Sequence, residues 1–358
     1  AKRFKLAMRA MCVLAENAGA VEWRDSIGAL RMVGFKSVLV GMVAGIALLG
    51  ACAADSGASD AAERPTMDEL RAEYDEALAK AQATGGPGSP ALWSMSDEDT
   101  TIYIFGTVHL LRPEVEWRYP AFDAALAEAD TVVFEVDLFT DEGLQAYMSE
   151  FVPNGMYEDG RTLRGVLSES DEAVIEAGMQ AAGAPIDAFN AFEPWMVSVN
   201  LGSMQLVADG YDAESGVEKV IQDEAVRAGK DFAYLEDLAD QLEVFDGMSE
   251  EAQIEMLYTT VLTLDAAGET VDHMVAEWAD GDVEGLGVLA ASGEGTPSAV
   301  EMYERLLVTR NRNWIPVIEG FLEEPGTFFI AAGSAHFAGP DSVILMLEEE
   351  GYTVERIN

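Results

Sequence analysis

Two short segments of similar design constrain the fold of this 358-residue chain most strongly. Thr101 to Leu111 reads TIYIFGTVHLL and Thr327 to Phe337 reads TFFIAAGSAHF, so each is an apolar, β-favouring run followed by Gly-x-x-His. Glycine after a strand lets the backbone turn sharply or adopt a positive φ. The next side chains then stand at the carboxyl edge of the strand, where ligands and chemistry collect in α/β sheets. Two of the chain's three histidines occupy this place.

The apolar runs elsewhere predict an α/β fold with a mixed central sheet, a large helical insertion and the two Gly-x-x-His loops at strand ends. The first loop follows a β-hairpin whose turn is the polar cluster SDEDT. Helical periodicity dominates from Asp141 to about Ala228 and from Leu238 to Leu289, so these helices are expected to cover the sheet. Strands are expected at Ala91–Met95, Thr101–Phe105, Thr131–Val136, Lys230–Glu236, Thr327–Gly333 and Tyr352–Ile357, and further helices at Met67–Gln82, Tyr119–Ala129, Ala299–Glu323 and Asp341–Glu349.

The first 90 residues are interpreted as a targeting segment and a linker rather than as part of the fold. Residues 1–31 have mixed charge and no clear pattern, which is typical of an upstream extension or a miscalled start. Residues 32–51 read as a lipoprotein-type signal peptide, because a short start with Lys36 precedes a Val, Ala and Leu core too short and Gly-rich for a stable span. Residues 52–90 read as a tether with one helix, and residues 91–358 as the folded domain.

The sequence Leu49-Gly50-Ala51-Cys52 resembles a bacterial lipobox, so Cys52 is expected to carry a lipid. Ala53 after it is no obvious inner-membrane retention signal, and we expect a lipid anchor in the bacterial cell envelope, on the periplasmic face of the outer membrane. The alternatives are an uncleaved N-terminal anchor or an ordinary signal peptide cut nearby. The other cysteine, Cys12, lies in the doubtful extension, so the mature chain would have no disulfide and no cysteine-based zinc cluster.

The chain is strongly acidic, with a formal net charge of −44. Residues 1–51 contribute +4, so the remainder carries −48. Such a surface repels nucleic acid and anionic lipid, and nucleic acid is not an expected partner. Two interpretations stay open: solubility in a salty medium, or attraction of metal cations or a basic peptide.

Four strand ends each deliver an ionisable side chain, namely His109, Glu135, Glu236 and His336. If the four strands are parallel neighbours, these side chains lie along one edge of one sheet. Two imidazoles with one or two carboxylates suit a divalent metal that activates water, and mixed N and O ligands are compatible with Zn²⁺, Mn²⁺, Co²⁺ or Fe²⁺. One of the glutamates can instead act as a general base.

Simpler interpretations exist for each of these residues. A single Gly-x-x-His more often marks a helix cap, an anion contact or a packed ring, whereas a matched pair in a histidine-poor chain favours a site. His273 lies on a helical stretch and is interpreted as packed, and Glu236 can belong to the surface excess of acids. Arg310, in the late helix, can hold a substrate carboxylate or a developing oxyanion, or can pair with a neighbouring glutamate.

The chain from Ala91 to Asn358 resembles the TraB/GumN family, which includes the pheromone-shutdown proteins and the Tiki proteases. The most specific stretches are YIFGTVHLL, ADTVVFEVD, YLEDLADQ, LLVTRNRNW and FFIAAGSAHFAGPDSVILMLEEEGYTVERI. The resemblance implies an α/β fold and, for the Tiki branch, metal-dependent peptide hydrolysis that favours Mn²⁺ or Co²⁺. The family hallmark falls on Gly106, His109, Gly333 and His336, and its acidic position falls on Glu135.

The leading hypothesis is a membrane-tethered, metal-dependent hydrolase acting on a peptide or protein. His109, His336 and Glu135 would hold Mn²⁺, Co²⁺ or Zn²⁺, Glu135 or Glu236 would be the base, and Arg310 would orient the substrate. The alternative is a non-catalytic envelope lipoprotein that binds a peptide, metal or haem, or that supports polysaccharide export. In a third, structural interpretation both loops only shape the sheet.

Overall fold

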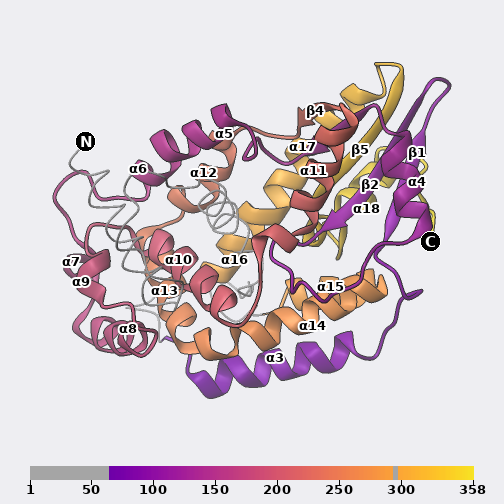
Figure 1. Ribbon diagram of the computed structural model, residues 1–358. Helices are drawn as coiled ribbons and strands as arrows, with labels where there is room; N and C mark the ends of the chain where they lie inside the picture. Colours follow the sequence, from indigo (N-terminus) through magenta and orange to yellow (C-terminus); the bar gives the residue numbers. More distant parts are fainter. Residues whose placement is uncertain (1–63, 293–296) are drawn as a thin grey trace.

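Six strands form one mixed sheet in the computed structural model, which describes residues 64–292 and 297–358 (Figure 1). The expected extension, signal peptide and Cys52 lie outside the described residues. The hairpin and the other strands are confirmed, although the last strand has only two residues. The strands are β1 (Leu92–Ser96), β2 (Thr100–Thr107), β3 (Thr131–Phe134), β4 (Asp231–Tyr234), β5 (Gly326–Gly333) and β6 (Glu355–Arg356).

The strand order β4-β3-β5-β2-β1-β6 places four parallel strands side by side. β2 and β3 flank β5 and are parallel to it, and β4 is parallel to β3. β1 returns antiparallel to β2, and β6 is antiparallel to β1. The carboxyl ends of β2, β3, β4 and β5 therefore meet at the same edge. This meets the condition under which the four ionisable side chains were expected to lie along one edge.

Both faces of the sheet are buried, which explains why its strands are nearly continuous apolar runs. Successive residues point to opposite faces. Phe105 and Phe329 pack under α4 (Pro120–Glu128), α11 (Val217–Ala228) and α14 (Ala267–Asp280). Ile104 and Ile330 pack against α17 (Arg310–Phe321) and α18 (Val343–Glu349) on the other face.

The predicted helical insertion forms a second body of helices beside the sheet, with its own core around Trp195 and Leu257 (Figure 1). Its central helix, α10 (Pro194–Ala208), is apolar almost all round, which is typical of a helix buried on every side. The remaining elements are α5 (Asp141–Ala146), η1 (Tyr147–Phe151), α6 (Val152–Asn154), α7 (Leu163–Val166), α8 (Glu169–Ala181), α9 (Ile186–Phe189), η2 (Ala213–Ser215), α12 (Leu238–Asp246), α13 (Glu250–Thr263), η3 (Leu264–Ala266), α15 (Val283–Ala290), α16 (Pro297–Tyr303), η4 (Glu304–Thr309) and η5 (Ser334–Phe337).

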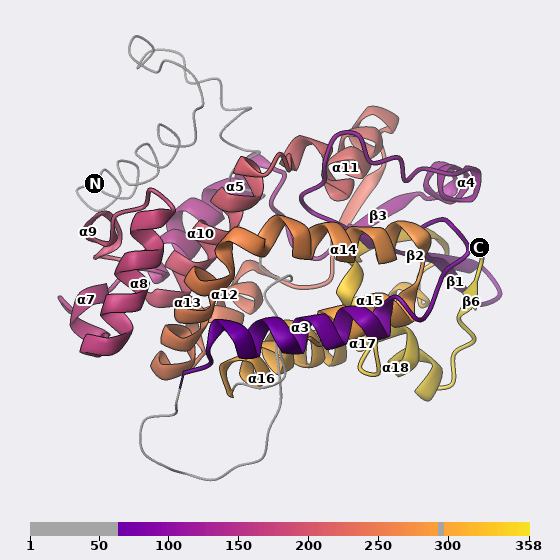
Figure 2. The same cartoon turned by 90° about the horizontal axis from the view of Figure 1, so that it is seen from below.

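The helix expected before the domain is present as α3 (Met67–Ala81), which begins with a capping box at Thr66. It lies along α14 and α15 rather than apart from them (Figure 2). The Tyr74 hydroxyl lies 2.9 Å from Nδ1 of His273 on α14, so His273 is a packed histidine of this contact. Part of the segment expected to be a tether is therefore packed on the domain. None of the helices in the described ranges is both long and apolar enough to cross a membrane.

The long late helix is interrupted. α16 passes into a π-helical stretch, η4, before α17 begins at Arg310. Extra residues per turn of this kind are frequent at functional sites, because they change which side chains face inward. Arg310 and Asn311 are both buried although they are adjacent in sequence. Both side chains thus reach the carboxyl edge of the sheet.

Candidate functional site

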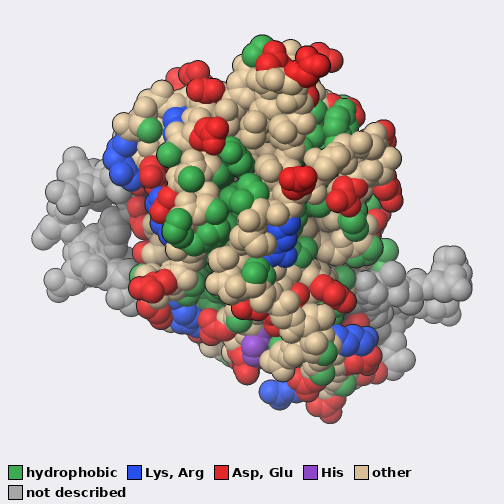
Figure 3. All heavy atoms as spheres, turned by 90° about the vertical axis from the view of Figure 1, so that its right-hand side faces the viewer, with side chains coloured by type: hydrophobic (Ala, Val, Ile, Leu, Met, Phe, Trp, Pro, Cys, Tyr) green, Lys and Arg blue, Asp and Glu red, His purple; other side chains and the backbone are tan. Residues whose placement is uncertain are grey.

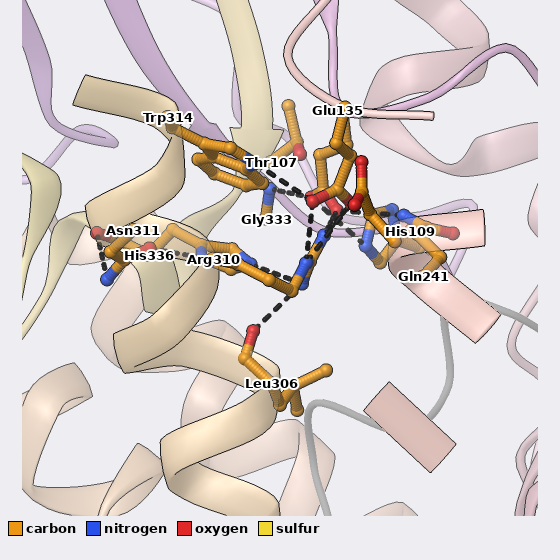
Figure 4. A network of polar contacts seen from close by, with 12 residues as sticks. Thr107, His109, Glu135, Gln241, Leu306, Arg310, Asn311, Trp314, Gly333 and His336 are labelled. Carbon is orange, nitrogen blue, oxygen red and sulfur yellow. Dashed lines mark hydrogen bonds and ion pairs between the residues drawn. The ribbon is translucent and has the colours of Figure 1, made fainter. Parts of the chain in front are cut away.

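A cavity of about 110 Å³ lies where the carboxyl ends of β2, β3 and β5 meet. Four of the residues predicted from the sequence line it: His109, Glu135, Arg310 and His336. Figure 4 shows them converging, with the guanidinium of Arg310 in the middle. The fifth, Glu236, contacts Arg310 but is not among the lining residues.

The two motif glycines serve close packing rather than an unusual backbone conformation. Gly106 lies inside β2, opposite Ala332 of β5, and Gly333 is the last residue of β5. Neither has a positive φ, so of the two roles expected for a glycine here the left-handed conformation is not used. A Cβ on Gly106 would lie 3.0 Å from the Cα and Cβ of Ser334, and one on Gly333 would lie 3.2 Å from Glu135 Oε1. A side chain at either glycine would therefore make the opposite strand end or the site side chains shift by a few tenths of an ångström.

His109 follows β2 and is held by a buried carboxylate. Its Nδ1 lies 2.5 Å from Glu218 Oε1, and the Thr107 hydroxyl donates to the same oxygen. Its Nε2 lies 4.0 Å from Glu135 Oε1. Burial alone would lower the pKa of His109, but the charges of Glu218 and Glu135 raise that pKa to about 9. At neutral pH His109 is therefore an imidazolium that donates at Nδ1 and can donate at Nε2.

Glu218 reaches His109 because α11 begins directly against the segment that follows β2. The amide of Val217 donates to the Val108 carbonyl at 2.9 Å. A Cβ at Gly216 would lie only 2.1 Å from the carbonyl oxygen of His109, so only glycine permits this approach. Glu218 then stands in the first turn of α11, where the helix dipole also favours a carboxylate.

Glu135, directly after β3, is an ionised carboxylate with four polar neighbours. Its Oε1 accepts a hydrogen bond from the Gly333 amide at 2.7 Å. Its Oε2 accepts from Arg310 Nη2 at 2.5 Å and from Gln241 Nε2 at 3.4 Å. Burial would raise the pKa of Glu135, but the charge of Arg310, helped by protonated His109 and the Gly333 amide, lowers it to about 2.

All five N–H groups of Arg310 have acceptors. Nε and Nη2 bind the carboxylate of Glu236 at 2.6 to 3.1 Å, and Nη2 also binds Glu135. Nη1 donates to the Leu306 carbonyl and to His336 Nε2, both at 2.9 Å. The two carboxylates raise the pKa of Arg310 although its burial opposes this. The site therefore contains a positive charge of fixed position and orientation.

Glu236 holds Arg310 in place. Both of its oxygens bind the guanidinium, and Oε2 also accepts from the indole N–H of Trp314 at 2.9 Å. The ring of Trp314 in turn packs on His336, with centroids 4.2 Å apart. Glu236 is thus occupied by structural partners, and of the two predicted glutamates Glu135 is the one that lines the cavity.

His336 lies in η5 and is a neutral imidazole of defined tautomer. Its Nδ1 lies 2.5 Å from Asn311 Oδ1, and the Nδ2 of Asn311 donates to the Asp341 carbonyl at 2.7 Å. The amide oxygen therefore faces the ring, Nδ1 carries the proton, and Nε2 accepts from Arg310. Burial, and then the charge of Arg310, lowers the pKa of His336 well below its ordinary value.

The expected metal ligands have suitable chemistry but not a suitable arrangement. Imidazole nitrogens with carboxylate partners and an ionised glutamate are common metal ligands. The guanidinium of Arg310, however, already binds His336 Nε2 and Glu135 Oε2. In the described part of the chain, no group of three or more His, Cys, Asp or Glu side chains is placed to hold a metal ion. The residues as arranged do not fit the expected metal.

Four polar residues of the site are not among the predicted site residues: Thr107, Glu218, Gln241 and Asn311. Asn311 lies beside Arg310 in the family stretch LLVTRNRNW, where its role was left open, Thr107 lies in YIFGTVHLL, and Gln241 ends YLEDLADQ. Their proximity to predicted residues was the signal. Glu218 has no such signal, because it is one of 65 acidic residues and lies far along the chain from His109.

The fold and the site together define an α/β protein with a buried acid, base and guanidinium cluster at the carboxyl edge of four parallel strands. Residues 91–356 match the TraB/PrgY/gumN family. This match covers most of the chain, and the chain belongs to that family. No curated protein and no solved structure shows a significant similarity to it.

Proposed function

We propose that this protein is a hydrolase that cleaves a peptide bond or a related acyl compound at the cavity. The proposal rests on one observation: a protonated imidazole and an ionised carboxylate lie close to the same point in the cavity. A proton donor, His109 Nε2, and a proton acceptor, Glu135 Oε1, lie 3.6 and 3.2 Å from the position of a Cβ on Gly333. A water molecule or substrate atom beside that glycine would contact both groups.

The reaction that this arrangement supports is general acid and base hydrolysis. Glu135 accepts a proton from water, the water oxygen adds to the carbonyl carbon, and the C–N bond breaks. His109 donates its Nε2 proton to the leaving nitrogen and regains a proton from Glu135, so the products are a carboxylic acid and an amine. The fixed charge of Arg310 keeps Glu135 ionised and favours a developing oxyanion nearby.

The direct test is digestion of a defined mixture of peptides by the purified protein, with the new termini identified by mass spectrometry. We expect cleavage by the wild type and a loss of roughly 100-fold or more in Glu135→Gln, because removal of a general base costs about 10²–10⁴-fold. His273→Gln is the matched control for His109→Gln, since His273 lies outside the cavity. Unchanged activity in Glu135→Gln or His109→Gln would refute the proposal.

The metal dependence implied by the family resemblance is tested with the same assay. A metal bound by His336 and Glu135 requires Arg310 to leave both of them. Activity that survives excess chelator would mean that Arg310, and not a metal ion, supplies the positive charge next to the developing oxyanion. Activity that disappears and returns with Mn²⁺, Co²⁺ or Zn²⁺ alone, with about one equivalent bound, would show that the metal displaces Arg310.

A haem-binding role without catalysis is less well supported. An imidazole that ligates haem iron needs a free ring nitrogen, and the buried Nε2 of His336 is engaged by Arg310. A Soret band on haem titration that disappears in His109→Ala would favour the haem-binding alternative instead.

Attachment to the envelope through a lipid on Cys52 is part of the proposal. Cys52 lies outside the described residues, and the expectation comes from the lipobox resemblance. Metabolic labelling with a fatty acid analogue is expected to mark the wild type and not Cys52→Ala. Recovery of both proteins in the soluble fraction would refute the anchor.

A further inference from the structure

The inner wall of the cavity indicates what kind of substrate the site accepts. Away from the charged cluster the wall consists largely of apolar side chains, among them Leu138, Phe139, Val244, Phe245 and Leu306. The positively charged residues among the described lining are Arg310, Lys219 and protonated His109.

All three already have carboxylate partners, and that of His109 is Glu218. Arg310 is saturated, and Lys219 Nζ lies 2.5 Å from Asp223 and 3.7 Å from Glu214. The wall therefore favours an uncharged apolar group over an acidic one.

Gln241 contributes a polar atom that the hydrolytic chemistry does not use. It lies on α12, one turn before Val244 and Phe245, so the three side chains share one face of that helix. Its side chain is buried and lines the cavity beside Glu135 (Figure 4).

The orientation of the Gln241 amide follows from its neighbour. Glu135 is ionised and can only accept hydrogen bonds, so Nε2 of Gln241 faces it at 3.4 Å and Oε1 points elsewhere. This Oε1 is buried and has no hydrogen-bond partner within the described residues. A buried carbonyl oxygen next to a candidate base suits a substrate N–H, because buried acceptors are normally paired.

We propose that Gln241 Oε1 accepts the backbone N–H of the substrate residue whose carbonyl is attacked, while the apolar wall receives that residue's side chain. The substrates are then peptides cut after a large apolar residue such as Leu, Met or Phe. This inference rests on the proposed hydrolase function and adds its specificity.

The test uses the full-length protein and two matched substrate sets. The first is one peptide with Leu, Phe, Asp or Lys at the residue before the cut. The second replaces that residue by its hydroxy acid, so an ester oxygen takes the place of the N–H while the scissile amide is unchanged. For the wild type we expect kcat/KM roughly tenfold higher for Leu and Phe than for Asp and Lys, and a roughly tenfold loss when the N–H is replaced.

The variant Gln241→Leu removes the acceptor at similar volume. We expect it to lower kcat/KM for the N–H substrates about tenfold more than for the ester-containing substrates, mainly through KM, because loss of the Nε2 contact with Glu135 affects both sets alike. Gln253→Leu is the matched control: Gln253 is also buried and hydrogen-bonded, but it lies on α13 outside the cavity. It should preserve the preference for the N–H even if it lowers stability.

Each outcome decides between the alternatives. Equal losses on both substrate sets in Gln241→Leu would make Gln241 a purely structural residue and overturn the inference. Efficient cleavage after Asp by the wild type would show that the apolar wall does not select the residue before the cut. The hydrolase proposal would still stand. Absence of cleavage of every peptide by the wild type would overturn the hydrolase function and this inference with it.

Discussion

The central residue of the site is Arg310, because it holds together groups that would otherwise repel each other. Glu135 and Glu236 come from two neighbouring strand ends, and both bind the same guanidinium. A planar group with five fixed donors can serve two carboxylates, a carbonyl and an imidazole at once. Lysine, with one compact ammonium, cannot reproduce these contacts.

We therefore expect Arg310→Lys to lower the free energy of unfolding by about 3 kcal/mol, because breaking a buried charge network costs about 3–5 kcal/mol and the retained charge recovers part of it. Activity should fall at least tenfold in the same variant. Urea denaturation measures the first effect. Arg312→Lys is the control, since Arg312 is exposed and pairs with Glu304 at the surface, and it should change stability by less than about 0.5 kcal/mol. Equal effects in the two variants would contradict the central role of Arg310.

The proton on His109 gives the site a predictable pH dependence. The pKa of His109 is raised to about 9 by Glu218 and Glu135 against the effect of burial. The acid form is the active one in the proposed mechanism, so the rate should hold below that pH and fall as pH rises through about 9. The same shift stabilises the fold fully below the ordinary histidine pKa of about 6.5, and this contribution is lost as pH rises toward 9.

The variant Glu218→Gln tests the cause of this shift. Without the carboxylate the pKa of His109 should drop, and the falling limb of the rate profile should move to lower pH. Imidazole NMR resolves this directly, because the chain has only three histidines. His273→Gln assigns the signal of His273 and should leave the profile unchanged. A falling limb that stays in place in Glu218→Gln would show that His109 is not the titrating acid.

At the scale of the elements, the site depends on how closely two strand ends and one helix start approach each other. The strands and the α4 helix follow from local apolar patterns. The parallel neighbourhood of the strands was only a condition of the predicted site. The order of the strands and the position of α11 depend on contacts between distant parts of the chain, which no local pattern encodes. His109 could therefore be predicted as a site residue from the sequence, but its contact with Glu218 could not.

Gly333→Ala tests this close approach. The added methyl group would lie 3.2 Å from Glu135 Oε1 and 3.6 Å from His109 Nε2, in the space proposed for water or substrate. We expect activity to fall at least tenfold, with a stability loss of about 1 kcal/mol, since small insertions into a packed site cost about 1–3 kcal/mol. Gly320→Ala, in α17 with open space around its Cα, is the control and should retain full activity. Full activity in Gly333→Ala would place the reaction elsewhere.

At the scale of the whole molecule, the acidic surface affects solubility and the choice of partners, and the N-terminal helix affects stability. Asp and Glu side chains are spread over the face in Figure 3, with few Lys or Arg among them. A net charge of −44 favours solubility and repels polyanions. The family match begins at residue 91, but the structured part extends further toward the N-terminus.

The contacts of that N-terminal part make it a component of the fold. Arg64 pairs with Asp171 on α8 and with Glu251 on α13, and Tyr74 bonds to His273 on α14. Tyr74 and Leu78 of α3 pack against the core cluster that also covers the sheet. A connection that only tethered the domain would have no reason to make these contacts.

We accordingly expect a chain that begins at residue 91 to be less stable than one that begins at residue 64. Losing the burial of a few apolar side chains at about 1.5–3 kcal/mol each should lower the midpoint of thermal unfolding by roughly 5 °C or more. Scanning calorimetry measures it, and Asp75→Asn, on the exposed side of α3 and away from its ends, is a neutral control in the longer chain. The site lies at the sheet edge rather than beneath α3, so the shorter chain should keep its activity at low temperature. Identical unfolding midpoints would instead make α3 part of the tether, and the domain would then begin where the family match begins.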